Sequence, residues 1–421
     1  MNDGIKMQEV TLDLIVEANN RLTGKVKHTP LEPNLQLSAR YEANVLLKRE
    51  DLQSIRSYKL RGALNKMMGL SEDERLNGIV AASAGNHSQA VAYSSNYLRI
   101  PGTIFMPMTT SRQKIKATER FGNGLVKLIL VGDDFDEAYK TAVLHAKSSG
   151  ATFVHPFNDP QVIAGQGTVG LEIHSDAKKH IDYLIVPIGG GGLISGVGTY
   201  MRNLSPDTTV IGVEPAEAPA MYRSLKKRKL VTLGKTFSHF VDGAAVRRVG
   251  DLTFSIGQKL GYEVILVPEG RVCTTMVDLY NQGIVTEPAG ALSIAALSQL
   301  GDKIRGKNVV CVLSGGNNDF NRLAEIGERS LIHEGVNHYF MIEFPQRPGA
   351  LLQFLQKSLG PTDDITRFQY TKRTAAEFGP ALVGIQLKNK DDYTPLVERF
   401  RKVGFQFEEI SNNRMFMRYF L

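Results

Sequence analysis

Residues 183–192 read YLIVPIGGGG, an apolar run that ends in four consecutive glycines. An uninterrupted run of large aliphatic side chains is typical of a strand buried on both faces of a parallel sheet. Four residues without side chains are costly in chain entropy, so a glycine run directly after a strand needs a reason. A backbone cradle for a phosphate group is the simplest one.

Similar apolar runs recur along the chain and are separated by segments long enough for a helix. This alternation predicts an α/β region with open, mainly parallel sheets. The expected strands are at residues 45–47, 78–82, 102–106, 127–131, 183–187, 209–213 and 309–313.

The pattern changes after Asp319, where a charged, helix-like connector leads into a different arrangement. Phe340, Ile342 and Phe344 alternate as in a strand, and a helix with Leu351, Leu352 and Leu355 as its apolar positions should follow. Two further strands are expected at residues 365–370 and 381–387. A helix with Leu396, Val397 and Phe400 on one face and a strand at 405–410 then complete a βαββαβ order, which is the ferredoxin-like plan.

Composition excludes several classes of protein. The 421 residues are 42% hydrophobic and 22% charged, an ordinary globular composition. The net charge of +7 is scattered except for residues 226–229, which we interpret as a surface helix end, so nucleic acid is not an expected partner. No apolar run approaches the ~18 residues of a membrane span. The N-terminus has no targeting pattern, and two cysteines fit a reducing compartment, so we expect a cytoplasmic protein.

Familiar catalytic motifs are missing from the sequence. Lys229 stands where a P-loop ending at residues 234–236 needs glycine, and the glycine run at 189–192 does not continue as G-x-G-x-x-G. The nine histidines include no H-E-x-x-H pair, and no G-x-S-x-G elbow is present. A P-loop, NAD binding, and metalloprotease and α/β-hydrolase chemistry are therefore not expected.

Four polar and glycine-rich segments remain, most of them at the end of an apolar run. They are SYKLRGA at 57–63, ASAGNH at 82–87, GGGG at 189–192 and SGGN at 314–317. Ligands bind beyond the carboxyl ends of strands in open α/β sheets, and helix N-termini there offer amides to anions. Together the segments predict a phosphorylated cofactor held near Lys59.

These segments, with EPAGA at 287–291, resemble the threonine/serine dehydratases of the tryptophan-synthase-β-like group of pyridoxal-phosphate enzymes. The resemblance covers most of residues 25–320. It implies a two-lobed catalytic region over residues 1–325, with a smaller lobe at about 55–155, and a connector at 326–336. Residues 337–421 resemble the ACT-like regulatory domain of biosynthetic threonine dehydratases.

The resemblance also implies roles for individual residues. Lys59 should carry pyridoxal phosphate as a Schiff base and act as the base that removes the Cα proton. Asn86 should bond the phenolic oxygen of the ring and Ser314 the pyridine nitrogen. The amides around the phosphate would be those of Gly189, Gly190, Gly191, Gly192 and Leu193. The residues around the substrate carboxylate would be Ser83, Ala84, Asn86 and His87.

Three positions depart from the family pattern. Tyr58 stands where phenylalanine is more common, and its hydroxyl needs a partner. Ala84 stands where the related serine racemases carry a serine, so an acid for racemisation is lacking. Glu214 and Ala218 resemble the start of a monovalent or divalent cation site, but Ala220 replaces an acidic residue sometimes found there. A structural turn without a metal explains this segment equally well.

The activity implied by the resemblance is dehydration of L-threonine to 2-oxobutanoate and ammonia, the committing step toward isoleucine. A dehydratase of serine or another β-hydroxy amino acid, or a β-replacement synthase of the same fold, stays open. A non-catalytic amino-acid sensor is the alternative from another class.

The C-terminal domain has implied partners of its own. Isoleucine is the expected effector and valine its antagonist, with the loop at Gly349 as the site. A purely structural dimerisation module is the alternative. Ferredoxin-like units of this kind pair through their edges, so a homo-oligomer is expected, a tetramer by resemblance.

Overall fold

The computed structural model describes residues 9–372, 376–413 and 415. These residues form two compact units. The first holds the described residues up to Glu269 together with Gln282–Asp319. The second holds Gly270–Asn281 together with the described residues from Phe320 on.

The first unit is built on two sheets, which confirms the predicted α/β class. In the larger sheet every neighbouring pair is parallel except β1 with β2. Its order is β1 (Leu31–Pro33), β2 (Asn44–Arg49), β10 (Asn308–Leu313), β7 (Tyr183–Pro187), β8 (Thr209–Pro215) and β9 (Glu263–Val267).

The smaller sheet is parallel throughout. Its order is β5 (Val126–Leu130), β4 (Gly102–Met106), β3 (Ile79–Ala82) and β6 (Thr152–Phe153). All four residues of β3 and five of the six in β10 are buried, as the uninterrupted apolar runs predict.

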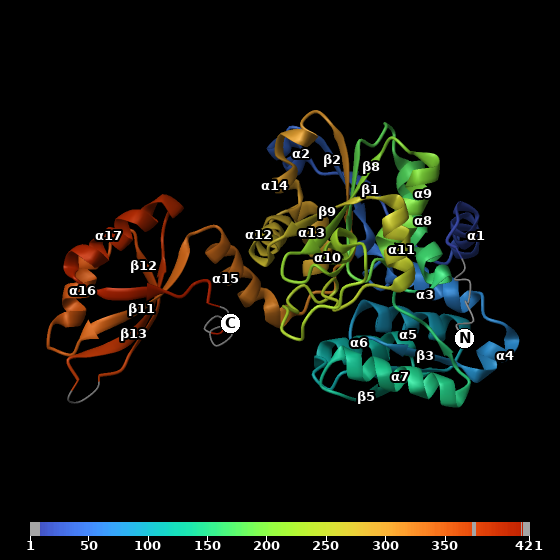
Figure 1. The fold of residues 1–421 in the computed structure, drawn as a ribbon, viewed down its shortest axis with the longest axis horizontal. Helices are drawn as coiled ribbons and strands as arrows, with labels where there is room; N and C mark the ends of the chain where they lie inside the picture. Colours follow the sequence, from blue (N-terminus) through green and yellow to red (C-terminus); the bar gives the residue numbers. More distant parts are fainter. Residues whose placement is uncertain (1–8, 373–375, 414, 416–421) are drawn as a thin grey trace. The chain divides into compact units, whose positions relative to one another are not determined.

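Helices surround both sheets, and the smaller sheet lies with its helices below the larger lobe in Figure 1. The smaller lobe contains α4 (Glu72–Asn77), α5 (Asn86–Leu98), α6 (Arg112–Gly122) and α7 (Phe135–Ser149). The other helices of the unit are α1 (Leu12–Leu22), α2 (Leu35–Tyr41), α3 (Lys59–Met68), α8 (Pro160–Asp176), α9 (Gly192–Leu204), α10 (Ala220–Lys227), α11 (Asp251–Leu260), α13 (Pro288–Ala295) and α14 (Leu297–Leu300). Short 3₁₀ turns lie at η1 (Glu50–Leu52) and η2 (Gly301–Ile304). None of the helices in the described part of the chain is long and apolar enough to cross a membrane.

The second unit contains the predicted βαββαβ order. It runs β11 (Asn337–Pro345), α16 (Ala350–Ser358), β12 (Asp364–Tyr370), β13 (Phe378–Gln386), α17 (Tyr393–Val403) and β14 (Gln406–Glu409), with a 3₁₀ turn η4 (Lys390–Asp392) before α17. The sheet is antiparallel in the order β12, β13, β11, β14. Most of α12 (Glu269–Tyr280) and the segment η3 (Phe320–Arg322) and α15 (Leu323–His333) belong to the same unit.

The packing face of α16 differs from the expected one. Leu351, Leu352 and Leu355 are 40%, 57% and 40% exposed, so they do not form its buried face. The buried positions are Ala350, Phe354 and Ser358, spaced four residues apart on one face of the helix. Phe354 alone supplies the large side chain, and the leucines beside it remain at the surface. In α17 the predicted face of Leu396, Val397 and Phe400 is buried, as expected.

Aromatic rings fill the core of the C-terminal unit. Phe344 on β11 is 1% exposed, and its ring centroid lies 5.1 Å from those of both Phe354 and Phe405 and 5.9 Å from that of Phe368. Such edge-to-face and tilted contacts add to the free energy of burying the rings. One strand residue therefore joins α16, β12 and the residue that precedes β14.

We expect Phe344→Ala to destabilise the C-terminal unit by about 3–5 kcal/mol, because it removes a fully buried ring and leaves a cavity. Hydrogen exchange of the β11 and β13 amides under increasing denaturant would measure the loss. Phe378→Ala is the matched control, since Phe378 pairs with Pro345 in the same two strands but is 55% exposed. An equal loss of stability in both variants would contradict the aromatic core described for this unit.

Candidate active site

Lys59 is the first residue of α3 and lies next to the carboxyl end of β10. Ser57 forms an isolated bridge with Gly315, and the amide of Tyr58 donates to the carbonyl of Ser314 at 3.2 Å. These bonds bring the predicted lysine and the predicted serine together from positions 255 residues apart. The Lys59 Nζ donates to the carbonyl of Pro156 at 2.9 Å, and it lies 5.4 Å from the centroid of the Tyr58 ring.

One segment that the sequence analysis did not single out connects the predicted site residues. Residues 154–158 follow β6 and run past three of them. The carbonyl of Val154 is 2.8 Å from the Nε2 of His87, and the carbonyl of Pro156 accepts from Lys59. The ring of Phe157 packs against the Cα of Gly190 so closely that a Cβ there would lie 2.2 Å from it. No chemical motif marks this segment, so only the fold reveals its place.

The glycine run packs so closely against neighbouring residues that side chains would not fit there. A Cβ on Gly191 would lie 2.8 Å from both Met221 and Thr253, and this residue has a φ of +92°. Gly191 caps α9, which begins at Gly192 without a side-chain cap. The first amides of a helix have no intrahelical acceptor, so they remain available to an anion. The predicted residues Gly189 to Leu193 therefore fit the phosphate of a cofactor.

The turn after β3 is partly exposed. Ser83, Ala84, Gly85 and Asn86 are partly exposed, whereas Ala82 and His87 on either side are buried. The helix α5 starts after Gly85 without a side-chain cap, and a Cβ on Gly85 would meet nothing within 4 Å. The turn therefore has room for a ligand. The first backbone amides of α5 can donate hydrogen bonds to a carboxylate there.

His87 does not present a charged ring to this turn. Burial, and next the positive charge of Lys59, lower the pKa of His87 to about 3, so the ring is neutral. Its Nε2 faces the carbonyl of Val154 and must carry the proton, which leaves Nδ1 as a bare acceptor. A carboxylate next to His87 would be held by the backbone amide of α5, because the imidazole has no proton to offer there.

Asn86 belongs to a polar network that includes a carboxyl group the sequence analysis left without a role. Its Nδ2 donates to the Oε1 of Glu287 at 2.7 Å, and its Oδ1 accepts from the Nδ2 of Asn317 at 2.7 Å. Glu287 opens the EPAGA segment, and its amide donates to the carbonyl of Gly315 at 3.2 Å. The EPAGA segment at 287–291 was the only sequence signal for Glu287. The hydrogen bond from Asn86 is what places its carboxyl group in the candidate site.

Burial shifts the pKa of both Lys59 and Glu287 toward neutral pH. Desolvation lowers the pKa of the Lys59 amine to about 8, partly offset by the negative charge of Glu287. Burial, and next the charge of Asp242, raise the pKa of Glu287 to about 7. A neutral amine is the form of lysine that attacks a carbonyl or takes a proton, so burial favours the reactive form of Lys59.

Ser314 directly follows β10 and is 3% exposed. Its hydroxyl is 3.4 Å from the carbonyl of Ala289, which is long for a hydrogen bond between two oxygens. The hydroxyl can therefore turn to a ligand group at little cost. A serine at this position offers a neutral hydrogen-bonding group and no charge.

Glu214 and Ala218 are both fully buried at the end of β8. The two carboxylate oxygens of Glu214 accept from the amides of Met221 and Tyr222 at 2.7 and 2.8 Å, in the first turn of α10. Burial raises the pKa of Glu214 to about 8 despite these bonds. A cation at Glu214 would have to replace its backbone donors. The described residues hold no group of three or more His, Cys, Asp or Glu side chains placed to bind a metal ion.

Gly349 lies in the other unit, at the turn between β11 and α16. Its φ is +81°, a conformation that favours glycine, and a Cβ there would meet nothing within 4 Å. The turn thus has the open backbone that the sequence analysis expects for an effector loop.

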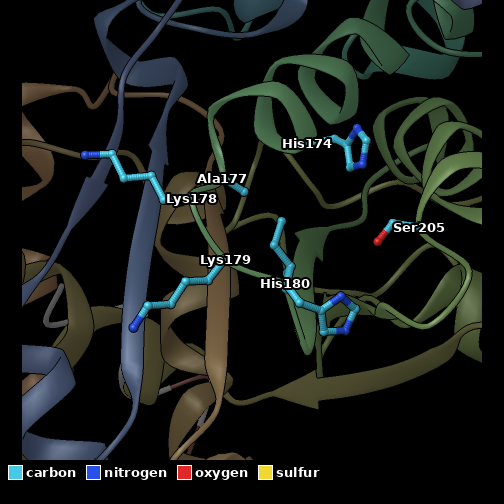
Figure 2. Close-up of a pocket in the computed structure, with 7 residues that line it drawn as sticks. His174, Ala177, Lys178, Lys179, His180 and Ser205 are labelled. Atoms are coloured by element: carbon cyan, nitrogen blue, oxygen red, sulfur yellow. The ribbon is translucent and has the colours of Figure 1, made fainter.

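A hollow of about 250 Å³ lies elsewhere on the first unit, between the end of α8, the residues before β7 and Ser205. Figure 2 shows Lys178 and Lys179 extending away from His174 and His180. Ile181 lines it at the amino end of β7, whereas the glycine run follows the carboxyl end of that strand. This hollow is separate from the site around Lys59.

Comparison with known families gives two matches. A family described as pyridoxal-phosphate dependent enzyme matches residues 22–315. A family described as the C-terminal regulatory domain of threonine dehydratase matches residues 328–420. The boundary between the two matches, at residues 316–327, agrees with the change of sequence pattern after Asp319.

Individual relatives match over nearly the whole chain. A biosynthetic L-threonine dehydratase of Halalkalibacterium halodurans is 54% identical over 408 residues, which is 97% of this chain and 98% of that protein. The enzyme of the same name from Bacillus subtilis is 54% identical over 95% of this chain and 94% of its own. Among solved structures, the processed form of threonine deaminase isoform 2 from Solanum lycopersicum has a TM-score of 0.72 and 37% identity, covering 77% of this chain and 91% of that one. Maize serine racemase has a TM-score of 0.70 and 29% identity, covering 77% and 99%.

We expect the cofactor-free protein to attach pyridoxal phosphate at Lys59 at a rate that rises with pH. The neutral amine is the reactive form, so the half-maximal rate should fall near pH 8 instead of the ordinary lysine value of 10.5. Visible absorbance of the bound cofactor would follow the attachment.

Glu287→Gln should move this midpoint to lower pH, because it removes the negative charge that raises the pKa of Lys59. Lys59→Arg serves as the control and should show no attachment at any pH. A midpoint that stays near 10.5 in the unaltered protein would refute the tuning of Lys59 by burial.

Proposed function

The chain belongs to the pyridoxal-phosphate-dependent enzymes, and within them to the biosynthetic threonine dehydratases with a C-terminal regulatory domain; from this premise we propose that it converts L-threonine to 2-oxobutanoate and ammonia. In this reaction the Cα proton and the β-hydroxyl leave the substrate as water. The enamine released from the enzyme takes up water again and loses ammonia.

One observation carries the proposal: the buried amine of Lys59 lies within the same set of contacts as Ser314 and the glycine run. Tyr58 is bonded to Ser314, Pro156 accepts from Lys59, and Phe157 packs on Gly190. These contacts bring Lys59, Ser314 and the glycine run together in the first unit, which supports the proposal.

Lys59 has two tasks in the proposed mechanism. Its amine holds the cofactor between reactions, and once released it takes the proton from the Cα atom of the substrate. When bound, pyridoxal phosphate supplies the sink for the electron pair that the broken Cα–H bond leaves behind. The pKa of about 8 for Lys59 keeps a useful fraction of the amine neutral near pH 7.

The other residues would bind and orient the cofactor and the substrate. The amides of residues 189–193 would bind the phosphate, Asn86 would bond the phenolic oxygen, and Ser314 would bond the ring nitrogen without placing a charge there. A carboxylate at this position would keep the ring nitrogen protonated, whereas the neutral hydroxyl of Ser314 would not, and we expect this difference to favour elimination over transamination. The start of α5, with Ser83 and Ala84, would receive the substrate carboxylate.

Ala84 argues against racemisation, because its methyl group cannot deliver a proton to the face of the substrate opposite Lys59. The fold is similar to that of maize serine racemase, but Ala84 offers no acid for racemisation in this chain.

The C-terminal domain is the proposed regulatory part. We propose that residues 337–421 bind isoleucine as inhibitor and valine as antagonist, near Gly349, after a connector at 326–336 that follows the catalytic region 1–325. The match to the regulatory domain of threonine dehydratase and the left-handed, open turn at Gly349 support this assignment. Inhibition requires tighter binding of isoleucine to the less active state, by about 1–3 kcal/mol in typical cases.

We further propose a homotetramer that acts in the cytoplasm. The sheet of the C-terminal domain ends in β12 and β14, whose outer edges have no neighbouring strand among the described residues. Such edges can pair with a second copy. The two cysteines fit a reducing compartment.

The activity is tested by steady-state kinetics with L-threonine and L-serine. We expect a higher kcat/KM for threonine, and we expect Lys59→Ala to abolish turnover of both while the protein still binds cofactor through residues 189–193. A strong preference for serine would overturn the substrate assignment. Full activity of Lys59→Ala would overturn the mechanism.

The effector site is tested by comparing Gly349→Ala with Gly404→Ala in the full-length protein. Both glycines have positive φ, +81° and +87°, with open space at the added Cβ, so both substitutions strain the backbone by about 1–2 kcal/mol. We expect only Gly349→Ala to weaken inhibition by isoleucine, with uninhibited activity retained. Equal isoleucine responses in the two variants would remove Gly349 from the effector site.

A further inference from the structure

Arg61 lies two residues after Lys59. Among the described residues, it has the largest side chain that is fully buried. Its guanidinium is held on every side. The Nε donates to Glu50 at 2.9 Å, and the two terminal nitrogens donate to Glu50 at 2.7 Å and to Glu172 at 2.6 and 2.8 Å. Further bonds reach the hydroxyl of Thr168 at 3.2 Å and the carbonyl of Lys27 at 3.3 Å. All the donor groups of the fork are thus used.

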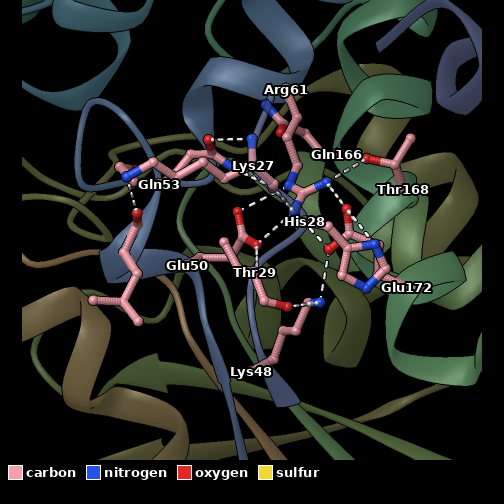
Figure 3. Close-up of polar contacts among 12 residues, drawn as sticks. Lys27, His28, Thr29, Lys48, Glu50, Gln53, Arg61, Gln166, Thr168 and Glu172 are labelled. Carbon is pink, nitrogen blue, oxygen red and sulfur yellow. Dashed lines mark hydrogen bonds and ion pairs between the residues drawn. The ribbon is translucent and has the colours of Figure 1, made fainter. Parts of the chain in front are cut away.

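The partners of Arg61 come from different parts of the fold. Glu50 lies in η1 at the end of β2, Glu172 and Thr168 lie on α8, and Lys27 precedes β1. Figure 3 shows these side chains converging on the guanidinium. Arg61 therefore fastens α3 to the end of β2 and to α8 at the same time.

A second buried cation balances the charges. Lys48 of β2 is 0% exposed, and its Nζ lies 2.7 Å from Glu172 and donates to the carbonyl of Thr29 at 2.6 Å. Burial alone would raise the pKa of Glu172, but Arg61 and Lys48 hold it below its ordinary value. We call Arg61, Lys48, Glu50 and Glu172 the buried charge cluster: two cations and two carboxylates.

The first turn of α3 depends on contacts of this kind because local ones are weak. Tyr58 occupies the N-cap position without a side-chain hydrogen bond, and the amide of Lys59 is 3.4 Å from the hydroxyl of Ser57. Gly62 allows the backbone of α3 to approach α8, since a Cβ there would lie 2.7 Å from the carbonyl of Val162. Close approach sets the distance between the two helices, and an anchored side chain is needed to set the rotation of α3.

Residues two apart on a helix point to different sides, so the side chain of Arg61 leaves α3 away from that of Lys59. A helix with one side chain locked in this way cannot turn about its axis without breaking several charged hydrogen bonds. We infer that Arg61, acting through Glu50 and Glu172, is a positioning residue that fixes the direction of Lys59 toward the bound cofactor. The inference rests on the proposed function, because it assigns the cluster to the reaction that Lys59 performs.

The charged groups of the cluster support a role in fixing the orientation of α3. Apolar side chains of similar volume often stabilise a fold as well as a buried ion pair does, because desolvation offsets the attraction between the charges. Directional bonds give what apolar packing cannot, a single orientation for the helix that carries them. A bidentate guanidinium defines that orientation through a plane, whereas an ammonium acts as a point charge.

Arg61→Lys in the full-length holoenzyme tests the inference, since it keeps the charge and removes the fork. We expect kcat to fall about 10- to 100-fold with KM within about threefold, because a small misplacement of the reacting group costs rate more than binding. The visible circular dichroism per bound cofactor should also change, since it reports how the cofactor is held and needs no turnover. Leu37→Ala is the matched control: Leu37 is 3% exposed on α2 of the same unit, outside the cluster, so its loss of thermal stability should leave the cofactor signal unchanged.

A normal cofactor signal and normal kcat in Arg61→Lys would overturn the inference, and so would equal changes in Leu37→Ala. If Arg61→Lys does not accumulate as folded protein, Glu50→Gln tests the same contact, because the amide keeps the shape and loses the charge. A folded Glu50→Gln with an unchanged cofactor signal would also refute the inference. If it too fails to fold while Leu37→Ala folds, the cluster acts in folding, which contradicts a positioning role.

The two levels of proposal fail separately. If the unaltered protein does not deaminate threonine, the proposed function fails, but the cofactor signal of Arg61→Lys can still be compared with that of the unaltered protein. If threonine is converted and neither the cofactor signal nor kcat changes in Arg61→Lys, the positioning role alone fails.

Discussion

The site depends on the pairing of β10 with β2 on one side and with β7 on the other. Parallel neighbours end at the same edge of a sheet, so this pairing places Ser314, Glu50 and the glycine run together. The chain then adds Lys59 through the bonds of Ser57 and Tyr58 to Gly315 and Ser314. Without this central strand, the residues of the site would have no common frame.

Burial decides the chemistry of the groups that the sheet collects. The amine of Lys59 loses solvation, and the pKa falls to about 8, while the pKa of the Glu287 carboxyl rises to about 7. His87 becomes a neutral ring whose proton is fixed by the carbonyl of Val154. Burial also imposes a desolvation cost on the charge of Arg61. The ion pairs with Glu50 and Glu172 offset that cost. Burial therefore favours the neutral forms of Lys59, Glu287 and His87, whereas pairing favours the charged forms of Arg61 and Glu172.

The two units are stabilised by different means. In the first, glycines let α8 approach its neighbouring helices, and a cluster of charges is buried between α8, α3 and the end of β2. In the second, a core of phenylalanine rings joins one sheet to its two helices. A catalytic unit needs defined directions for its side chains, which charged hydrogen bonds supply. A small α+β domain gains most of its stability from the apolar area that it covers.

The sequence by itself determined the long buried strands, the βαββαβ order, and the residue types of the site, because apolar periodicity and glycine placement are local properties of the chain. Strands as short as β1 and β6 carried too little pattern to be predicted, whereas β9 contains an aliphatic run at 264–267 that was not among the expected strands. The tertiary structure alone decided that Leu351, Leu352 and Leu355 remain exposed, since Phe354 takes the buried side of α16. It also decided the contacts of Glu287, Pro156 and Arg61. Their roles come from neighbours tens to hundreds of residues away, and no local pattern records which neighbours those will be.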